Sequence, residues 1–204
     1  MADKLGAIIL AGGSGKRFNG KKQFIDFMGK PLWKHSYDTA CEIVDKENII
    51  RVSIDVPGGE TRTLSVSNGL NALANDTERV LIIEAARPLV TAEQLAQLAN
   101  DTNKSTTFVS PLVNTVIMRN GDYLNRDEMY EILTPQAFDY RMLLDAINSK
   151  CFYDITDDTR IMYEYHGEKP KFIPTGRNLM KVTYQEDMYI LQKMYNNLYK
   201  KEKR

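Results

Sequence analysis

The feature that most constrains this chain is an apolar run near its start that leads directly into glycines. Residues 6–11 read Gly-Ala-Ile-Ile-Leu-Ala without polar alternation, and glycines follow at positions 12, 13 and 15. An apolar run of this kind is typical of a strand buried on both faces of a parallel sheet. A glycine loop after such a strand is suited to phosphate groups, because its backbone N–H groups are free and closely approachable.

The rest of the chain predicts the same class of fold. Helical patterns alternate with strand-like runs, and the alternation indicates βαβ units. The helical patterns cover residues 32–44, 61–75, 184–201 and a segment that begins at Thr91; the runs cover 49–56, 80–83 and 171–174. We therefore expect a Rossmann-like, doubly wound, mostly parallel α/β sheet. With 204 residues, the chain has the length of one domain, 1–204.

The middle of the chain does not follow the βαβ pattern. Residues 106–110 and 115–119 are short strand-like runs, and Asn120-Gly121 is a strong hairpin signal. We expect a small β-arm at about 112–132. Further on, Asp157 and Asp158 fit the charged start of a helix better than a metal site.

Composition excludes several classes of partner. The 27 Lys and Arg residues balance 27 Asp and Glu residues, so no excess of basic charge is available for nucleic acid or for an anionic membrane surface. No apolar run reaches the ~18–20 residues of a membrane-spanning helix. Cys41 and Cys151 have no CxxC spacing, and we expect buried, reduced thiols of a cytoplasmic protein.

Three phosphate-binding patterns were compared with the glycine loop. A dinucleotide fingerprint would need a third glycine where Phe18 stands, and a Walker loop would need a hydroxyl residue where Lys22 stands. The third pattern is the loop together with its basic surroundings. Residues 16–34 contain six Lys or Arg residues and a single acid, Asp26. This concentration of positive charge beside a glycine loop predicts a polyphosphate site.

The run at residues 7–30 resembles the opening of the nucleotidyltransferases that join a nucleoside monophosphate to a sugar or polyol phosphate. Within that group, the chain is similar to the cytidylyltransferases that act on 2-C-methylerythritol 4-phosphate and on ribitol 5-phosphate. Five further blocks match in order, at residues 58–69, 85–88, 133–136, 156–158 and 181–183. The resemblance implies a nucleotide-diphospho-sugar transferase type of fold, with the β-arm used for dimerisation. Residues 125–136 look closer to the ribitol 5-phosphate branch.

The resemblance also implies a nucleotide site, to which Gly13 belongs. The residues implied to read the cytosine are Ala11, Gly12, Gly59 and Ser65. The residues implied to hold the triphosphate are Gly15, Arg17 and Lys22. Glu84 and Ala85 are placed beside the ribose, and Glu84 is the candidate ligand of Mg²⁺ or another divalent cation.

A second set of residues is implied to bind the polyol phosphate. It consists of Arg87, Thr115, Arg126, Thr134 and Lys181, with Arg126 reaching in from the neighbouring subunit of a homodimer. In the implied reaction, a phosphate oxygen of the acceptor attacks the α-phosphorus of CTP and pyrophosphate leaves. Because this nucleophile is already an anion, no general base is needed, and positioning and charge stabilisation dominate. The catalytic set implied is Arg17, Lys22 and Lys181.

Four functions remain open at this stage. The leading one is a ribitol-5-phosphate cytidylyltransferase that forms CDP-ribitol for teichoic acid or capsule biosynthesis. The alternatives are the 2-C-methylerythritol 4-phosphate enzyme of isoprenoid biosynthesis, a glycerol-phosphate enzyme, and a degenerate family member that acts as a binding protein. The small-molecule partners would be CTP and a polyol phosphate.

The chain departs from the family pattern in places that bear on the site. Glu84 follows Ile83 where the family has an aspartate after a histidine, and Lys21 replaces a proline. Residues 54–58 pass almost directly into the glycines, where the family has room for a further helix and strand. We therefore expect the sheet to lack one βαβ element and the floor of the cytosine site to be altered.

Overall fold

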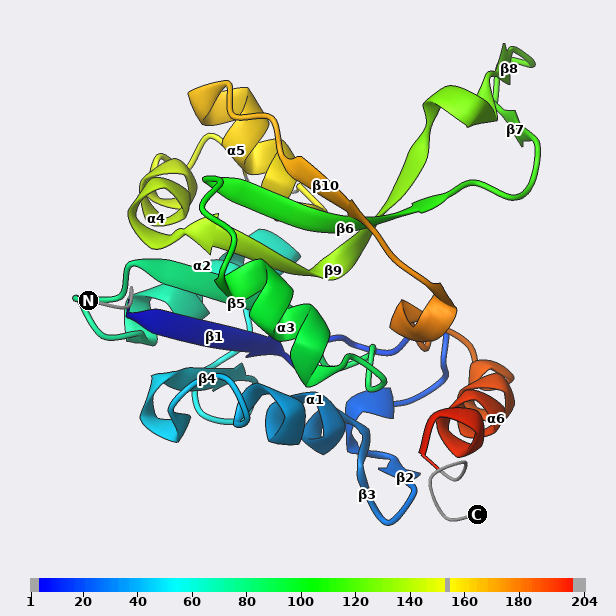
Figure 1. The fold of residues 1–204 in the computed structure, drawn as a ribbon, viewed down its shortest axis with the longest axis horizontal. Helices are drawn as coiled ribbons and strands as arrows, with labels where there is room; N and C mark the ends of the chain where they lie inside the picture. Colours follow the sequence, from blue (N-terminus) through cyan, green and yellow to red (C-terminus); the bar gives the residue numbers. More distant parts are fainter. Residues whose placement is uncertain (1–3, 153–154, 200–204) are drawn as a thin grey trace.

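The computed structural model describes residues 4–152 and 155–199, which form a central sheet with helices on both faces (Figure 1). Its strands, in chain order, are β1 (Leu5–Leu10), β4 (Ile49–Val52), β5 (Arg79–Glu84), β6 (Ser105–Pro111), β9 (Tyr130–Asp139) and β10 (Lys171–Pro174). Across these described residues the spatial order is β10-β6-β9-β5-β1-β4. Only the pairs that involve β9 are antiparallel. The predicted mostly parallel α/β sheet is confirmed.

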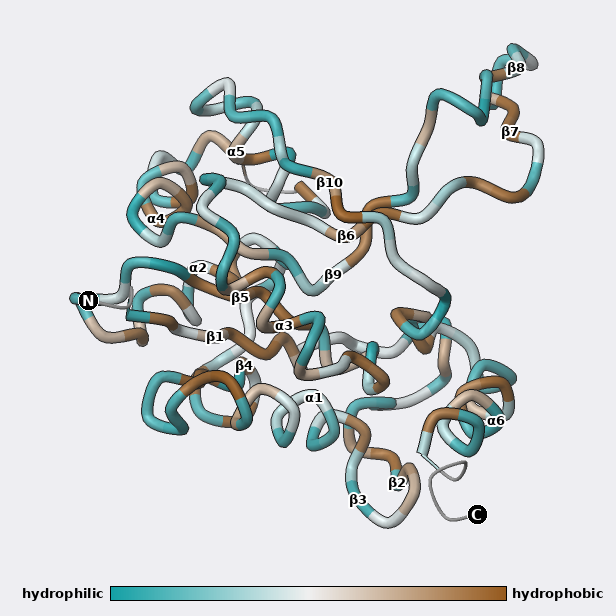
Figure 2. Tube along the Cα trace, viewed as in Figure 1, coloured by the Kyte–Doolittle hydropathy of each residue, from teal (hydrophilic) through white to brown (hydrophobic). Residues whose placement is uncertain are grey.

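Alternate side chains of the central strands enter two separate cores, which explains the uninterrupted apolar run in β1. Ala7 and Ile9 pack on one face under α1 (Leu32–Ala40) and α3 (Ala92–Ala99). Ile8 packs on the opposite face. The helices on that face are α2 (Arg62–Ala72), α4 (Tyr140–Asn148) and α5 (Asp158–His166). Figure 2 shows hydrophobic colours along β1 and β5, between helices that carry hydrophilic residues outward.

The helices begin where the capping residues predict. Thr61 accepts a hydrogen bond from the Leu64 N–H at 3.2 Å, and Thr91 forms a reciprocal capping box with Gln94. Asp157 is the N-cap of α5 and accepts from the Thr159 N–H at 2.9 Å, so the helix-start interpretation of Asp157 is confirmed. At its other end, α1 stops at Ala40, short of the predicted 44.

The last described helix, α6 (Asp187–Tyr199), begins three residues later than predicted. The Asp187 carboxylate accepts the N–H groups of Thr183 and Tyr184 at 2.7 and 2.8 Å, which fixes these residues in a turn before the helix. Residues 200–201 of the predicted helix lie outside the described residues.

Strand β9 and helix α4 were not predicted from the sequence. Pro135 lies inside β9, and a proline normally argues against a central strand because it cannot donate to the ladder. The pairing with β6 shifts register at this point: Thr107 pairs with Gln136 and Phe108 pairs with Leu133. Thr134 and Pro135 therefore form a bulge, which lets the strand continue through the proline.

The β-arm extends the outer ends of β6 and β9 away from the body (Figure 1). It carries β7 (Val116–Ile117) and β8 (Tyr123–Leu124), which pair antiparallel around the predicted Asn120-Gly121 turn. Gly121 has a φ of +98°, a conformation that favours glycine. The strand expected at 115–119 comprises only the two residues of β7. On the paired strand β8, the side chain of Tyr123 is 75% exposed.

Two other expectations concern the burial of the two cysteines and the presence of membrane-spanning helices. Cys41 and Cys151 are free thiols, but Cys41 is half-buried and Cys151 is exposed, so the expectation that both are buried was wrong. Within 4–152 and 155–199, no helix has the length and apolar character needed to cross a membrane.

Candidate functional site

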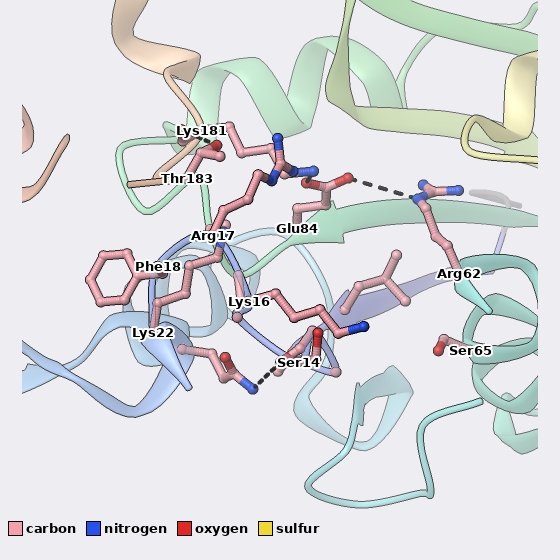
Figure 3. Close-up of a pocket in the computed structure, with 18 of the residues that line it drawn as sticks. Ser14, Lys16, Arg17, Phe18, Lys22, Arg62, Ser65, Glu84, Lys181 and Thr183 are labelled. Carbon is pink, nitrogen blue, oxygen red and sulfur yellow. Dashed lines mark hydrogen bonds and ion pairs between the residues drawn. The ribbon is translucent and has the colours of Figure 1, made fainter. Parts of the chain in front are cut away.

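A pocket of about 510 Å³ lies at the carboxyl ends of β1 and β5, a volume typical of small-molecule sites (Figure 3). Four separate parts of the chain line it: the glycine loop, the start of α2, the end of β5, and the segment before α6. Every residue predicted for the nucleotide or for catalysis is in this lining: Ala11, Gly12, Gly13, Gly15, Arg17, Lys22, Gly59, Ser65, Glu84, Ala85 and Lys181. The structure therefore brings these predicted residues together.

The glycine loop is folded by a turn at Gly15. Gly15 has a φ of +65°, and a Cβ added there would lie 1.7 Å from the carbonyl oxygen of Gly20. Its own carbonyl accepts the N–H groups of Phe18 and Gly20 at 2.9 and 3.2 Å. Among the residues that the structure describes, the N–H groups of 12–17 enter no hydrogen bond. These donors are therefore available to an anion in the pocket.

The opposite wall is built by Gly59 and Ser65. The Gly59 N–H donates to Ser65 Oγ at 3.0 Å, and the Ser65 hydroxyl donates to the Thr61 carbonyl at 3.0 Å. A Cβ on Gly59 would lie 2.3 Å from the Leu64 Cβ, so only glycine fits this close approach. Ser65 is buried, and it fixes the backbone that faces the pocket.

Cations crowd one side of the pocket. Lys16, Arg17, Lys22 and Lys181 all line it. Lys22 donates to the Val182 carbonyl, which ties the glycine-loop segment to the segment before α6. Burial, followed by the charge of Lys181, lowers the pKa of Lys22 below its ordinary 10.5, although Glu84 opposes the shift. A bound polyphosphate would offset this mutual repulsion.

The lowered pKa of Lys22 gives a pH prediction. Lys22 is charged at neutral pH and loses its proton as the pH rises through a pKa below 10.5. We expect kcat/KM for the nucleotide to fall along an alkaline limb set partly by this loss, since kcat/KM reports the free enzyme. In Lys22→Arg, whose guanidinium stays protonated, the limb should move to higher pH. An identical alkaline limb in both proteins would contradict the prediction.

Glu84 stands between cations of two different elements (Figure 3). Its Oε2 forms an ion pair with Lys181 Nζ, and its Oε1 lies 3.8 Å from Arg62 Nε. Burial alone would raise the pKa of Glu84, but Lys181, Arg62 and Arg87 outweigh burial and lower it. Glu84 is therefore a carboxylate at neutral pH.

Arg62 is the most important pocket residue that sequence reasoning missed. Its guanidinium binds both carboxylate oxygens of Asp158, at 2.8 and 2.7 Å, and the Asp158 side chain is fully buried. Burial would lower the pKa of Arg62, but the charges of Asp158 and Glu84 raise it above its ordinary value. The matching blocks at 58–69 and 156–158 each hold one partner, and this was the only available signal.

The donor set in the pocket is compatible with Mg²⁺. This ion binds through one or two carboxylates and takes its other ligands from water and substrate phosphates. Glu84 supplies one carboxylate, half-buried beside these cations. No group of three or more His, Cys, Asp or Glu side chains within the described ranges forms an all-protein metal cage. Glu84 is thus the residue that would hold the ion, together with a bound triphosphate.

The residues predicted for the second substrate do not line the pocket, apart from Lys181. Arg87 and Thr134 are buried together, with Arg87 Nε donating to Thr134 Oγ1 at 2.8 Å. Arg87 also donates to the Leu179 carbonyl, two residues before Lys181. Thr115 and Arg126 are exposed on the β-arm, where Arg126 donates to the Val113 carbonyl. Within one subunit, the structure does not bring these two residues to the pocket.

Comparison with known proteins shows the family of this chain. The family described as "IspD: 2-C-methyl-D-erythritol 4-phosphate cytidylyltransferase" matches residues 5–196. The chain belongs to this family. A 2-C-methyl-D-erythritol 4-phosphate cytidylyltransferase of Clostridium botulinum (strain Langeland) is 31% identical, over 228 aligned positions that cover 96% of this chain and 99% of the relative. A bifunctional enzyme IspD/IspF of Pelagibacter ubique is 33% identical, with 95% of this chain and 57% of that protein covered.

A solved structure supports the same IspD relationship. The 4-diphosphocytidyl-2C-methyl-D-erythritol synthase from Anaerococcus prevotii matches with a TM-score of 0.80 at 26% identity, covering 96% of this chain and 97% of that one. These comparisons favour the 2-C-methyl-D-erythritol 4-phosphate branch over the ribitol branch. Residues 125–136 were a poor guide because 125–129 are on the arm, and none of 125–136 lines the pocket.

Proposed function

We propose that this protein transfers the cytidylyl group of CTP to 2-C-methyl-D-erythritol 4-phosphate and releases pyrophosphate. The proposal rests on one observation. In one pocket, a glycine loop with open N–H groups faces Lys22, Lys181 and Glu84. Family membership supports this choice of acceptor, because the relatives are named for this substrate.

The reaction brings two anions together, and the pocket residues suit that task. The N–H groups of the glycine loop and the side chains of Arg17 and Lys22 would hold the triphosphate. Lys181, on the segment before α6, would approach the acceptor phosphate and the α-phosphate between them. Fixed cations aimed at this position stabilise the added negative charge of the transition state. Gly59 and Ser65 would bound the cytosine on the other side.

Mg²⁺ fits this arrangement as an additional positive charge on the phosphates, and Glu84 would be its protein ligand. In the described structure the Glu84 carboxylate pairs with Lys181 and lies near Arg62. Both cations therefore hold the carboxylate at the edge of the phosphate side.

Pyrophosphate release tests the proposal. The purified protein is incubated with CTP, MgCl₂ and one acceptor at a time: 2-C-methyl-D-erythritol 4-phosphate, ribitol 5-phosphate or glycerol phosphate. We expect fast release with the first acceptor only. Fast release with ribitol 5-phosphate alone would restore the ribitol-phosphate function. No release with any acceptor, despite CTP binding, would favour a binding protein.

The β-arm leads to a second proposal, that the active form is a homodimer. Ile117 is 53% exposed and Tyr123 is 75% exposed on an arm that projects from the body, and such side chains are suited to a partner surface. In a dimer, Arg126 would reach the pocket of the neighbouring subunit. Within one subunit, its place on the arm keeps it away from the pocket. Sedimentation equilibrium should give twice the 23.3 kDa chain mass. A monomer at the concentrations used for turnover would contradict this proposal.

A further inference from the structure

The connection between β4 and α2 is unusually direct. It consists of residues 53–61 and contains no helix, and its only strand pairing is an isolated bridge between Val56 and Val52. As a result, β4 is the edge strand of the described sheet (Figure 1).

A turn held by hydrogen bonds begins this connection. Ser53 has a φ of +74°, and its N–H donates to the Val56 carbonyl at 2.7 Å. Asp55 accepts both the backbone N–H and the Nε of Arg51 at 2.8 Å. The carboxylate thereby satisfies a backbone donor on the edge strand and closes the turn.

The turn places the Ser53 side chain between two glycines. A Cβ added to Gly12 would lie 2.6 Å from Ser53 Oγ, and a Cβ added to Gly58 would lie at the same distance. The hydroxyl therefore occupies the space that side chains at both positions would need. Gly12 belongs to the glycine loop, and Gly58 directly precedes Gly59 on the opposite wall of the pocket.

The same region is joined to the glycine loop by its backbone. The Ala11 N–H donates to the Val52 carbonyl at 3.2 Å, one residue before the turn. The wall at Gly59 is in turn fixed by Ser65 Oγ. The two glycines also approach each other directly, since a Cβ added to Gly12 would lie 3.9 Å from the Gly58 Cα. Ser53 Oγ lies against both segments where they meet.

We infer that Ser53 is a positioning residue for the nucleobase: it sets the spacing between Gly12 and the Gly58–Gly59 segment, and so the width of the slot that receives the base. The inference rests on the proposed function, because it assumes that this slot takes the cytosine. Ser53 does not line the pocket itself, so it acts through the two glycine segments.

The test compares two glycine substitutions at residues with positive φ. Lys150 has a φ of +58° and does not line the pocket. Ser53→Gly and Lys150→Gly both remove the backbone strain of a non-glycine residue with positive φ, so neither should lower the melting temperature. Only Ser53→Gly removes the spacer. We expect it to weaken CTP binding about tenfold, equivalent to about 1.4 kcal/mol, and Lys150→Gly to leave binding unchanged.

Isothermal titration calorimetry with two probes separates the possible results. CTP engages the base slot and the phosphate side, whereas inorganic tripolyphosphate engages the phosphate side alone. In Ser53→Gly, CTP binding should weaken while tripolyphosphate binding stays at the wild-type level. Ser53→Ala, which retains the backbone strain and loses the hydroxyl, should show the same selective loss and serves if the glycine variant misfolds.

The contrary results are distinct. If wild-type protein binds CTP no more tightly than tripolyphosphate, the pocket does not read the base, and both the proposed function and this inference fail. If wild-type protein prefers CTP and both Ser53 variants keep that preference, only the inference is overturned. Equal weakening of both probes would also overturn it, because Ser53 would then support the pocket as a whole.

Discussion

Replacing Lys22 or Lys181 by alanine is expected to lower kcat/KM for CTP turnover by about 10²–10³, the range for loss of one donor aimed at a transition state, or ~2.7–4 kcal/mol. Lys22 lies in the pocket beside the glycine loop, and Lys181 faces it from the segment before α6. Each substitution removes one positive charge from the pocket in which the proposed reaction brings two anions together. Initial rates of pyrophosphate release measure the effect.

The two lysine variants should differ in one respect. Lys181→Ala also removes an ion-pair partner of Glu84, whose side chain is only 13% exposed, so we expect this variant to lose some stability as well. Lys22→Ala removes a partly buried charge whose pKa is already lowered by burial, and should keep the wild-type melting temperature. Lys4→Ala is the control, since Lys4 pairs with Asp76 at the surface. Turnover near the wild-type rate in either pocket variant would refute its assignment.

The second large effect is on stability. Asp158→Ala is expected to lower the free energy of unfolding by about 3–5 kcal/mol, because it leaves the Arg62 guanidinium buried without its bidentate partner. Chemical denaturation followed by circular dichroism at neutral pH gives the value. The unpaired Arg62 would then lie beside Glu84 alone, so activity should fall in the folded fraction too.

A matched carboxylate at the surface controls for the loss of an ion pair as such. Asp76→Ala removes an aspartate whose side chain is 69% exposed and should change the free energy of unfolding by about 0–1 kcal/mol. Replacing both members of the buried pair by apolar residues, as in Arg62→Met with Asp158→Leu, should recover much of the lost stability. A cost for Asp158→Ala as small as that for Asp76→Ala would show that the buried pair contributes little.

The parts of the fold that were predictable from sequence have a local cause. The buried runs in β1 and β5 and the caps at Thr61, Thr91 and Asp157 depend on residues adjacent in the chain. Strand β9 depends on distant pairing instead, since its bulge at Thr134 and Pro135 exists only against β6. The end of β4 at Val52 likewise follows from the turn at Ser53, whose positive φ no sequence pattern announced.

The site divides in the same way. The glycine loop could be predicted from residues that follow one another, and the family resemblance supplied Ser65, Glu84 and Lys181. The Arg62–Asp158 pair was missed because its members are 96 positions apart, in two separate matching blocks, and nothing in either block shows that they meet. The positioning role inferred for Ser53 could not be predicted either, because it arises from a turn that brings two glycine segments onto one hydroxyl.

The hydrogen bond between Lys22 and the Val182 carbonyl joins residues 160 positions apart, and this separation has a consequence for synthesis of the protein. A ribosome adds about 5–20 residues per second, so about 8–32 s pass between the addition of Lys22 and that of Val182. During this interval the nascent chain carries the glycine loop, but neither Lys181 nor the Val182 carbonyl that accepts the hydrogen bond from Lys22 has been added. The complete pocket therefore forms only late in synthesis, after the first strands have emerged.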